Sequence, residues 1–352
     1  MSRPGAATSE PHNPLTTREG WARFVSAKPL ELQLVPEERL ALLNGFRRDD
    51  YERDRLDYHA QLIVVATPTV RQVAHSGRRL ALLNRGQISA RRGLIVTGTA
   101  GTGKTTAITQ LGKQHEHQAR RRRQGKAPFQ PVVFVTIPPA ATAKMVAAEF
   151  ARFLGIPLPS RPNQIEITNM VCDVLCDLGT DLVIVDEIHN LNLGSRTGAE
   201  TSDQLKYLSE RIPATFLYAG IDVESAGLFT GTRGRQIAGR FATLTTSPFA
   251  YGTQTERNDW SSLIATLEDA LKLYRHRPGS LVRLAPYLHQ RTSGMIGSLS
   301  HLIREAAIEA ILNGSEKLTK PLLERVTLDH AAETSRPKAH RSRAGRHPGK
   351  VA

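Results

Sequence analysis

The stretch "TGTAGTGKTT" (residues 97–106) follows directly on an apolar run, "GLIV", at 93–96. Gly98 is followed by four residues and then by Gly103-Lys104-Thr105, the spacing of G-x-x-x-x-G-K-[ST]. Small residues let backbone N–H groups turn towards phosphates at the start of a helix. A flexible loop is the alternative. The preceding strand-like run and the following helix-compatible run favour a phosphate site.

This motif predicts a binding site for ATP and Mg²⁺. Lys104 is expected to reach the β- and γ-phosphates, and the Thr105 hydroxyl to bind Mg²⁺. The residues expected to bind the nucleotide are Gly98, Thr99, Ala100, Gly101, Thr102, Gly103, Lys104, Thr105 and Thr106.

A second motif, "LVIVDE" at 182–187, complements the first. Four apolar residues predict a buried strand, and Asp186 and Glu187 emerge at its carboxyl end. Ligands bind at that end of the strands in open α/β sheets. We expect Asp186 to support Mg²⁺ and Glu187 to polarise the attacking water. A solvated loop is the alternative for this acidic pair.

Strand-like and helix-like runs alternate from residue 93 onwards. Short apolar runs predict strands at 94–97, 131–137, 181–187 and 214–220, with helical runs such as 103–123, 142–155 and 165–179 between them. Such alternation predicts an α/β fold with a central parallel sheet flanked by helices. After Trp260 the pattern is helical only, which indicates a small lid domain. The expected organisation is a disordered N-terminus (1–20), a helical extension (21–90), an α/β nucleotide-binding core (91–255), a helical lid (256–333) and a basic disordered tail (334–352).

The 352-residue chain carries a net charge of +14, of which six charges lie in the acid-free stretch at 334–350. A basic excess of this kind favours a polyanionic partner such as DNA, although solubility alone is the alternative. No apolar run approaches the ~20 residues that span a bilayer. The N-terminus lacks the apolar segment of a signal peptide, and two cysteines make no disulfide framework. We therefore expect a cytoplasmic protein without a membrane partner.

A third motif, "GTRGRQIAGRF" at 231–241, offers Arg233, Arg235 and Arg240. Phosphoryl-transfer sites often receive an arginine from a neighbouring molecule. We favour Arg240, which precedes Phe241, as a catalytic residue acting on the nucleotide of a second subunit. A surface arginine without contact to phosphate is the alternative.

These motifs together resemble AAA+ ATPases, and more closely TniB and TnsC, the ATP-dependent regulators of DNA transposition. The resemblance covers about residues 60–330, and its most specific part is "SGMIGSLSHLIREAA" at 293–307. It implies a homo-oligomer, a ring or helical filament, that assembles with ATP on duplex DNA in the nucleoid. It also implies a partner transposase similar to TniA or TnsB, and a targeting protein similar to TniQ.

The resemblance also suggests where DNA would bind. TnsC-like proteins contact DNA through segments after the second strand, which correspond here to Lys144, Arg161 and Asn163. The basic run "ARRRRQGK" at 119–126 adds Arg121 and Arg122 as candidates for contact with DNA or the transposase. Each of these side chains could instead be an ordinary solvated one.

Two departures from the AAA+ pattern predict slow hydrolysis. The tip of the fourth strand, at 218–220, lacks a polar sensor residue, and Gly297 or Ser298 stands where a sensing arginine is common. His189 follows the acidic pair and has two open roles: it could relay the nucleotide state towards a neighbour, or cap the strand end.

Two other functions fit parts of this pattern. The sequence "DEIH" at 186–189 prompts a helicase, but such a motor needs a second RecA-like lobe, and the residues after 187 predict mostly a helical lid. A nucleotide-switched scaffold without nucleic acid would use the same core and leave the arginine runs incidental.

Overall fold

The structure is a computed structural model that describes residues 13–40, 42–123, 125, 127–158, 160, 163–191, 196–224 and 239–334, with the backbone alone at 196–199. These residues form two compact units. Unit 1 is drawn from Met1–Glu31 and Ile63–Pro248, and unit 2 from Leu32–Leu62 and Phe249–Ala352. No helix among the described residues is long and apolar enough to cross a membrane.

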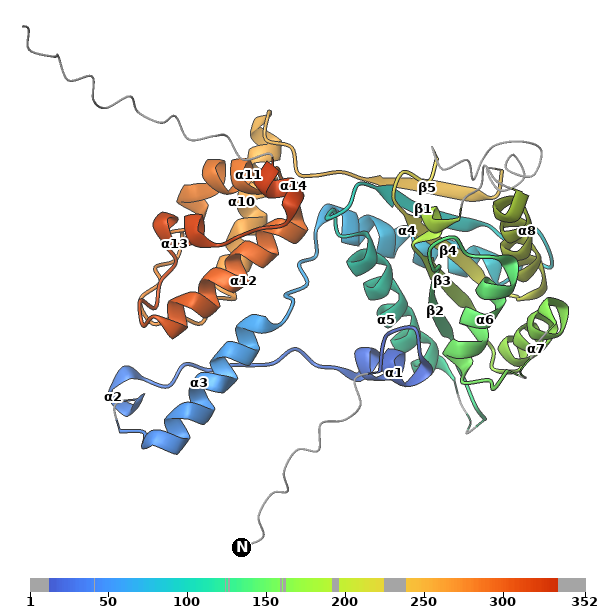
Figure 1. Ribbon diagram of the computed structural model, residues 1–352, viewed down its shortest axis with the longest axis horizontal. Helices are drawn as coiled ribbons and strands as arrows, with labels where there is room; N and C mark the ends of the chain where they lie inside the picture. Colours follow the sequence, from blue (N-terminus) through green and yellow to red (C-terminus); the bar gives the residue numbers. More distant parts are fainter. Residues whose placement is uncertain are drawn as a thin grey trace, which may run out of the picture. The chain divides into compact units, whose positions relative to one another are not determined.

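Unit 1 is built on a five-stranded parallel sheet with the order β2-β3-β4-β1-β5 (Figure 1). The strands are β1 (Gly93–Gly98), β2 (Val132–Thr136), β3 (Leu182–Asp186), β4 (Thr215–Gly220) and β5 (Phe241–Thr246). The predicted α/β fold with a central parallel sheet is therefore confirmed. Strand β5, which pairs with β1 as the outermost strand of the sheet, was not predicted from the sequence.

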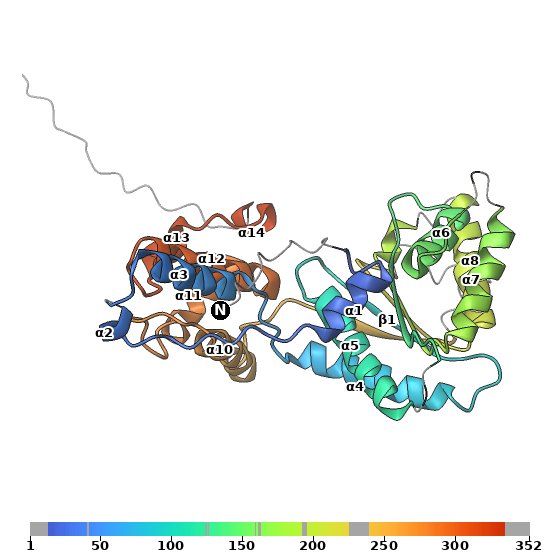
Figure 2. The same ribbon diagram turned by 90° about the horizontal axis from the view of Figure 1, so that it is seen from below.

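Helices cover both faces of this sheet (Figure 2). On one face lie α1 (Arg18–Ser26), α4 (Pro68–Asn84) and α5 (Lys104–Arg122), and on the other α6 (Ala143–Leu154), α7 (Gln164–Asp177) and α8 (Arg196–Arg211). Because both faces are covered, the central strands are apolar throughout rather than alternating.

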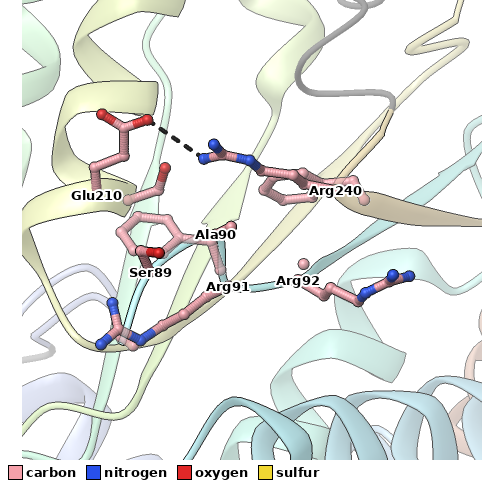
Figure 3. A pocket seen from close by; sticks show the side chains of 11 residues that line it. Ser89, Ala90, Arg91, Arg92, Glu210 and Arg240 are labelled. Carbon is pink, nitrogen blue, oxygen red and sulfur yellow. Dashed lines mark hydrogen bonds and ion pairs between the residues drawn. The ribbon is translucent and has the colours of Figure 1, made fainter. Parts of the chain in front are cut away.

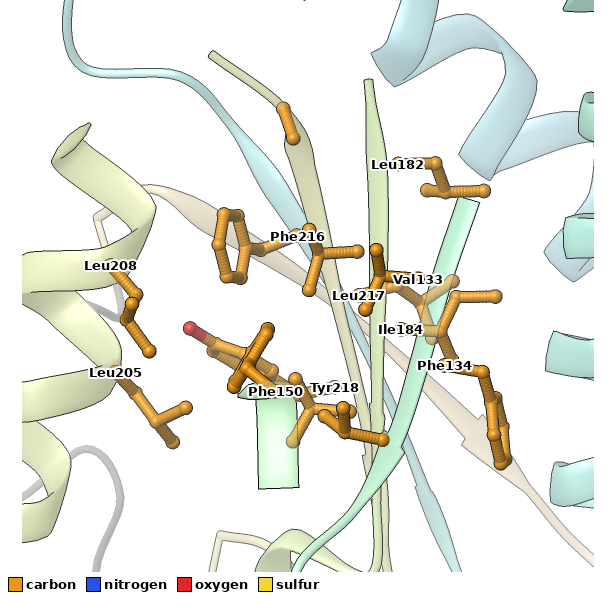
Figure 4. Packing of buried hydrophobic residues seen from close by; sticks show 14 of the residues in the cluster. Val133, Phe134, Phe150, Leu182, Ile184, Leu205, Leu208, Phe216, Leu217 and Tyr218 are labelled. Carbon is orange, nitrogen blue, oxygen red and sulfur yellow. The ribbon is translucent and has the colours of Figure 1, made fainter. Parts of the chain in front are cut away.

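The two faces of the sheet have separate apolar contacts. Leu205 and Leu208 of α8 and Phe150 of α6 lie on the same side of the sheet as Phe216 (Figure 4). On the opposite face, the ring of Phe134 stacks on Trp21 of α1 with 5.8 Å between centroids.

Unit 2 is helical throughout its described part, as expected for the lid. It contains α10 (Gln254–Asp269), α11 (Ala285–Thr292), α12 (Ile296–Leu312), α13 (Lys320–Arg325) and α14 (His330–Thr334), together with α2 (Glu37–Leu40) and α3 (Gly45–Ala60). The segment 21–90 is thus shared between the units: α1 and α4 belong to unit 1, and α2 and α3 to unit 2.

Helix α3 packs on α12, and a buried ion pair joins α3 to the segment that follows α12. Arg55 has no exposed side-chain surface and donates to both carboxylate oxygens of Glu316, at 2.9 and 2.6 Å. Its guanidinium also lies 4.9 Å from the ring centroid of Tyr274. Breaking a buried pair by removing one partner leaves the other charge buried, so this contact holds the segment 32–62 to the lid.

His59, one turn further along α3, is buried and neutral in this arrangement. Its Nδ1 donates to the Arg55 carbonyl and its Nε2 accepts from the Lys272 N–H at 3.2 Å. Burial, reinforced by the Arg55 cation, lowers the pKa of His59 from its ordinary 6.5. The unfolded chain therefore binds a proton at His59 more readily than the folded one.

We predict that this histidine makes unit 2 sensitive to acid. Its contribution to the free energy of unfolding is complete above pH 6.5 and is lost as the pH falls from there towards the folded-state pKa. The difference in thermal unfolding midpoint between wild type and His59→Gln should shrink between pH 7.5 and 5.5. The exposed His75 supplies the control, since His75→Gln should follow the wild type at every pH. A constant difference for His59→Gln would contradict the assignment.

Candidate functional site

The glycine-rich loop joins the carboxyl end of β1 to the N-terminus of α5. Gly98 has a φ of +142°, and a Cβ there would lie 2.1 Å from the Thr246 carbonyl oxygen, so only glycine fits. Gly103 caps α5 with a φ of +86° and provides no side-chain bond to its first N–H groups. These N–H groups and the positive end of the helix dipole therefore face the loop, which suits an anion.

Lys104 lies within this loop as the first residue of α5. Its Nζ donates to the carbonyls of Gly98 and Thr99, at 2.8 and 2.7 Å. Burial lowers the pKa of Lys104, and the carboxylates of Glu187, Asp186 and Asp222 act in the opposite direction. The ammonium is thus held among the loop carbonyls and beside the acidic groups at the ends of β3 and β4.

Thr105 and Asp186 meet as the two motifs require. The Thr105 hydroxyl donates to Asp186 Oδ2 at 2.9 Å, and Asp186 Oδ1 accepts from the Glu187 N–H at 2.9 Å. Burial raises the pKa of Asp186, and these two bonds oppose the shift. A hydroxyl and a carboxylate are hard oxygen ligands, and Mg²⁺ is commonly held by one or two such groups together with phosphates and water. These two side chains therefore fit the expected metal.

Glu187 is next to the same site, in a strained backbone conformation. Its φ is +58°, a left-handed value that costs a non-glycine residue about 1 kcal/mol or more. The carboxylate lies 3.3 Å from Nε2 of His189. The structure thus brings Lys104, Thr105, Asp186 and Glu187 together at one edge of the sheet.

Thr246, at the carboxyl end of β5, contacts the phosphate loop. Its hydroxyl lies 2.7 Å from the Thr102 hydroxyl and 3.1 Å from the Thr97 carbonyl, and its one hydrogen can be donated to either. Thr102 in turn donates to the Thr99 carbonyl. This residue was not among those predicted from the sequence. The β-branched run "ATLTT" at 242–246 could have revealed it, since it predicts a strand that ends beside the loop.

Arg240 lies just before the amino end of β5, whereas the phosphate loop lies at the carboxyl end of the neighbouring strand β1. In the β1–β5 register, Gly93 pairs with Phe241 and Gly98 with Thr246. Six residue steps of about 3.3 Å therefore separate Arg240 from the level of Gly98, roughly 20 Å along the strands. An arginine so placed cannot reach the phosphates bound by its own chain.

The backbone of Arg240 is held in place, while its side chain is half exposed. The Arg240 carbonyl accepts from the Gly93 N–H at 3.0 Å. The Phe241 ring fills the space where Gly93 would carry a Cβ, at 2.1 Å, and stacks on Tyr218 with 4.7 Å between centroids. The guanidinium therefore projects from a fixed base.

A pocket surrounds this guanidinium (Figure 3). Arg240 Nη1 lies 3.3 Å from Glu210 Oε1, at the end of α8. The side chains of Arg91 and Arg92 line the same pocket but point away from Arg240. Arg233 and Arg235 lie outside the described residues.

The candidate DNA contacts that the structure describes do not form one surface. Lys144 is exposed in the first turn of α6, beyond the carboxyl end of β2, whereas Arg121 and Arg122 are exposed at the far end of α5. That end approaches the start of β3, since His115 of α5 pairs with Asp181 at 2.6 Å. Asn163 caps α7 by accepting from the Ile165 N–H. Arg161 lies outside the described residues.

The part of the chain that contains these motifs matches a known protein family. The family described as "Bacterial TniB protein" matches residues 61–251, more than half of the chain, including both nucleotide motifs and Arg240. The chain belongs to the TniB family. No curated protein matches the sequence.

Solved structures show the fold of this TniB-family chain. The Aeropyrum pernix ORC1 protein in complex with DNA has a TM-score of 0.58 at 17% identity, covering 79% of this chain and 67% of that one. The Aeropyrum pernix ORC2 protein in ADPNP and ADP complexes has a TM-score of 0.59 at 17% identity, covering 80% and 71%. Drosophila ORC bound to DNA has a TM-score of 0.52 at 12% identity, covering 87% and 72%. The TniB-family chain therefore has the AAA+ fold.

We predict that Thr246→Val weakens nucleotide binding. Valine preserves the shape of the side chain but removes the hydroxyl that supports Thr102. Losing a buried hydrogen bond costs about 1–2 kcal/mol, so the Kd for a fluorescent ATP analogue should rise by roughly five- to thirtyfold. Thr245→Val alters the exposed neighbour and should leave the Kd unchanged. An unchanged Kd for Thr246→Val would show that the loop holds its shape without this hydroxyl.

Proposed function

We propose that this TniB-family protein is a Mg²⁺-dependent ATPase that assembles with ATP on duplex DNA and presents that DNA to a partner transposase. In this proposal ATP acts mainly as an assembly signal, and hydrolysis is slow. A ring or helical filament of identical chains would be the active form. A TniQ-like targeting protein is a further expected partner, and the bacterial nucleoid the expected location.

One observation carries the proposal. Arg240 lies at the amino ends of the strands and the phosphate loop at their carboxyl ends, on opposite sides of the same sheet. A head-to-tail contact between two copies would bring the Arg240 edge of one to the phosphate edge of the next. Such heterologous contacts generate rings or open helices. The nucleotide would then be bound by one chain and completed by its neighbour, which couples ATP binding to assembly.

Within each composite site the residues would have separate roles. The loop from Gly98 to Thr106 binds the phosphates, and Lys104 neutralises their charge. Thr105 and Asp186 would hold Mg²⁺, which supplies charge neutralisation when bound. Glu187 accepts a hydrogen bond from the attacking water and orients it. Arg240 of the neighbour stabilises negative charge on the transferring phosphoryl group.

The two rival functions make different demands. A helicase of the DExH type needs a second RecA-like sheet, whereas unit 2 is helical throughout the part that the structure describes. A scaffold that ignores nucleic acid would share the ATP site, so only a DNA-binding measurement separates it from the proposal. Strand displacement by the purified protein would revive the helicase.

We predict that Lys104→Ala abolishes ATP binding and the assembly that depends on it. Glu187→Gln should bind ATP normally and form longer-lived assemblies, because it leaves the phosphate contacts intact and no longer polarises water. Light scattering with duplex DNA and ATP follows both variants. Rapid disassembly of Glu187→Gln, or normal assembly of Lys104→Ala, would contradict these roles.

Arg240→Ala should lower kcat by about a hundredfold or more, since arginines that act on a neighbour's nucleotide contribute roughly 10³–10⁵ in other nucleotide hydrolases. Its ATP affinity as a monomer should be unchanged. Mixing it with Glu187→Gln, which still binds ATP and assembles, tests the action between subunits. About one quarter of the interfaces would then join an intact nucleotide site to an intact arginine, and activity should return in proportion. Two inactive variants that stay inactive together would refute the composite site.

Binding to duplex DNA should require ATP and fall steeply with salt. Contacts to phosphates release counterions, so affinity should drop by orders of magnitude between about 50 and 200 mM salt, with little dependence on sequence. Lys144→Ala should weaken binding and reduce the salt slope, whereas the exposed Lys28→Ala should not. Fluorescence anisotropy with and without ATP measures both. A protein that ignores DNA in either condition would favour the scaffold.

A further inference from the structure

His189 occupies the middle of a 3₁₀ turn, Ile188–Asn190, directly after the acidic pair at the end of β3. The last residue of the turn is anchored to the end of the neighbouring strand: the Asn190 side-chain amide donates to the Ile137 carbonyl, just beyond β2, at 2.8 Å. The position of the imidazole is therefore set by the ends of two neighbouring strands.

The two ring nitrogens of His189 have different partners. Nδ1 accepts from the Ile221 N–H at 3.2 Å, and Nε2 lies 3.3 Å from Glu187 Oε2. A backbone N–H can only donate, so Nδ1 must offer its lone pair. In the neutral ring the proton then belongs to Nε2, which faces the Glu187 carboxylate. The tautomer follows from the partner on the other side of the ring.

Ile221 is the first residue after β4, and this strand end is closely packed against the turn. A Cβ on Gly220 would lie 3.1 Å from the backbone nitrogen of His189. Two residues later, the Val223 N–H donates to the Thr97 hydroxyl, at the end of β1. A continuous path of contacts thus runs from the strand before the phosphate loop, through the residues after β4, to His189 and Glu187.

The end of β4, at 218–220, provides no polar side chain that contacts the imidazole or the Glu187 carboxylate. Ala219 and Gly220 are apolar, and Tyr218 is buried against Phe241. The backbone N–H of Ile221 is the group by which this tip contacts the imidazole, and His189 extends that contact to the carboxylate.

We propose that His189 is a positioning residue for Glu187: its Nε2–H fixes the carboxylate in one orientation while its Nδ1 anchors the ring to the end of β4. The inference deepens the proposed ATPase function and rests on it. With Oε2 held by the imidazole, Oε1 is left to accept from the attacking water.

Two substitutions separate the two contacts of the ring. The Oδ1 of asparagine occupies roughly the place of Nδ1 and can accept from Ile221, but asparagine does not reach Glu187. The Nε2 of glutamine occupies roughly the place of the imidazole Nε2 and can donate to Glu187. Both variants remain polar and close in size to histidine. The experiment measures kcat and KM for ATP with duplex DNA present, together with ATP-dependent assembly.

His189→Gln should keep kcat within about threefold of the wild type, and His189→Asn should lower kcat by about tenfold. The KM for ATP and the ATP concentration for half-maximal assembly should change by less than about twofold in both, because the phosphate contacts are untouched. A histidine that only closes the turn would show the reverse order, with asparagine tolerated and glutamine not. That result, or wild-type kcat in both variants, would overturn the proposal.

The same assay distinguishes this inference from the proposed function. Glu187→Gln measured in parallel should lose hydrolysis whatever His189 does. If Glu187→Gln is inactive while both His189 variants hydrolyse normally, only the positioning role fails. If Glu187→Gln hydrolyses ATP like the wild type, the assignment of Glu187 itself fails, and the positioning role falls with it.

Discussion

The parallel register of β1 and β5 is the constraint on which the rest of unit 1 depends. It fixes the phosphate loop at one end of a strand pair and Arg240 at the other. Both ends are braced by the same pair: Thr246 supports the loop, and Phe241 fills the space left by Gly93. Because the sheet is rigid, it keeps Arg240 and the phosphate loop at a fixed distance from each other. A single copy of the chain therefore cannot bring them together.

Much of this core could be predicted from sequence, because its signals are local. The loop spacing, the strands at β1 to β4 and the helices α5 to α7 lie close to where the patterns indicated them. Thr105 and Asp186 are 81 positions apart, yet both follow buried parallel strands, and the carboxyl ends of such strands share one edge. Their hydrogen bond could therefore be expected from the sequence pattern.

The rest had weaker local signals. Strand β5 is partly exposed at the sheet edge and reads "FATLTT", which is less apolar than the central strands, and α8 is largely polar. The Thr246–Thr102 contact depends on how β5 is aligned with β1, and the spacing of residues in the sequence does not give that alignment. The predicted DNA contacts were assigned by likeness to relatives, and Lys144 and Arg121 lie at opposite ends of their elements. Those roles stay predictions.

The pairing of α3 with the lid has a consequence for synthesis on the ribosome. Arg55 and Glu316 are separated by 261 positions, and all five strands of the sheet lie between them in the sequence. At roughly 5–20 residues per second, α3 emerges about 10–50 s before its partner helix does. Unit 1 can fold during this interval, whereas α3 has no partner helix to pack on until α12 is synthesised. Phe46 of α3 is exposed even in the complete protein. A nascent chain in this interval is the form most open to chaperones and to proteases.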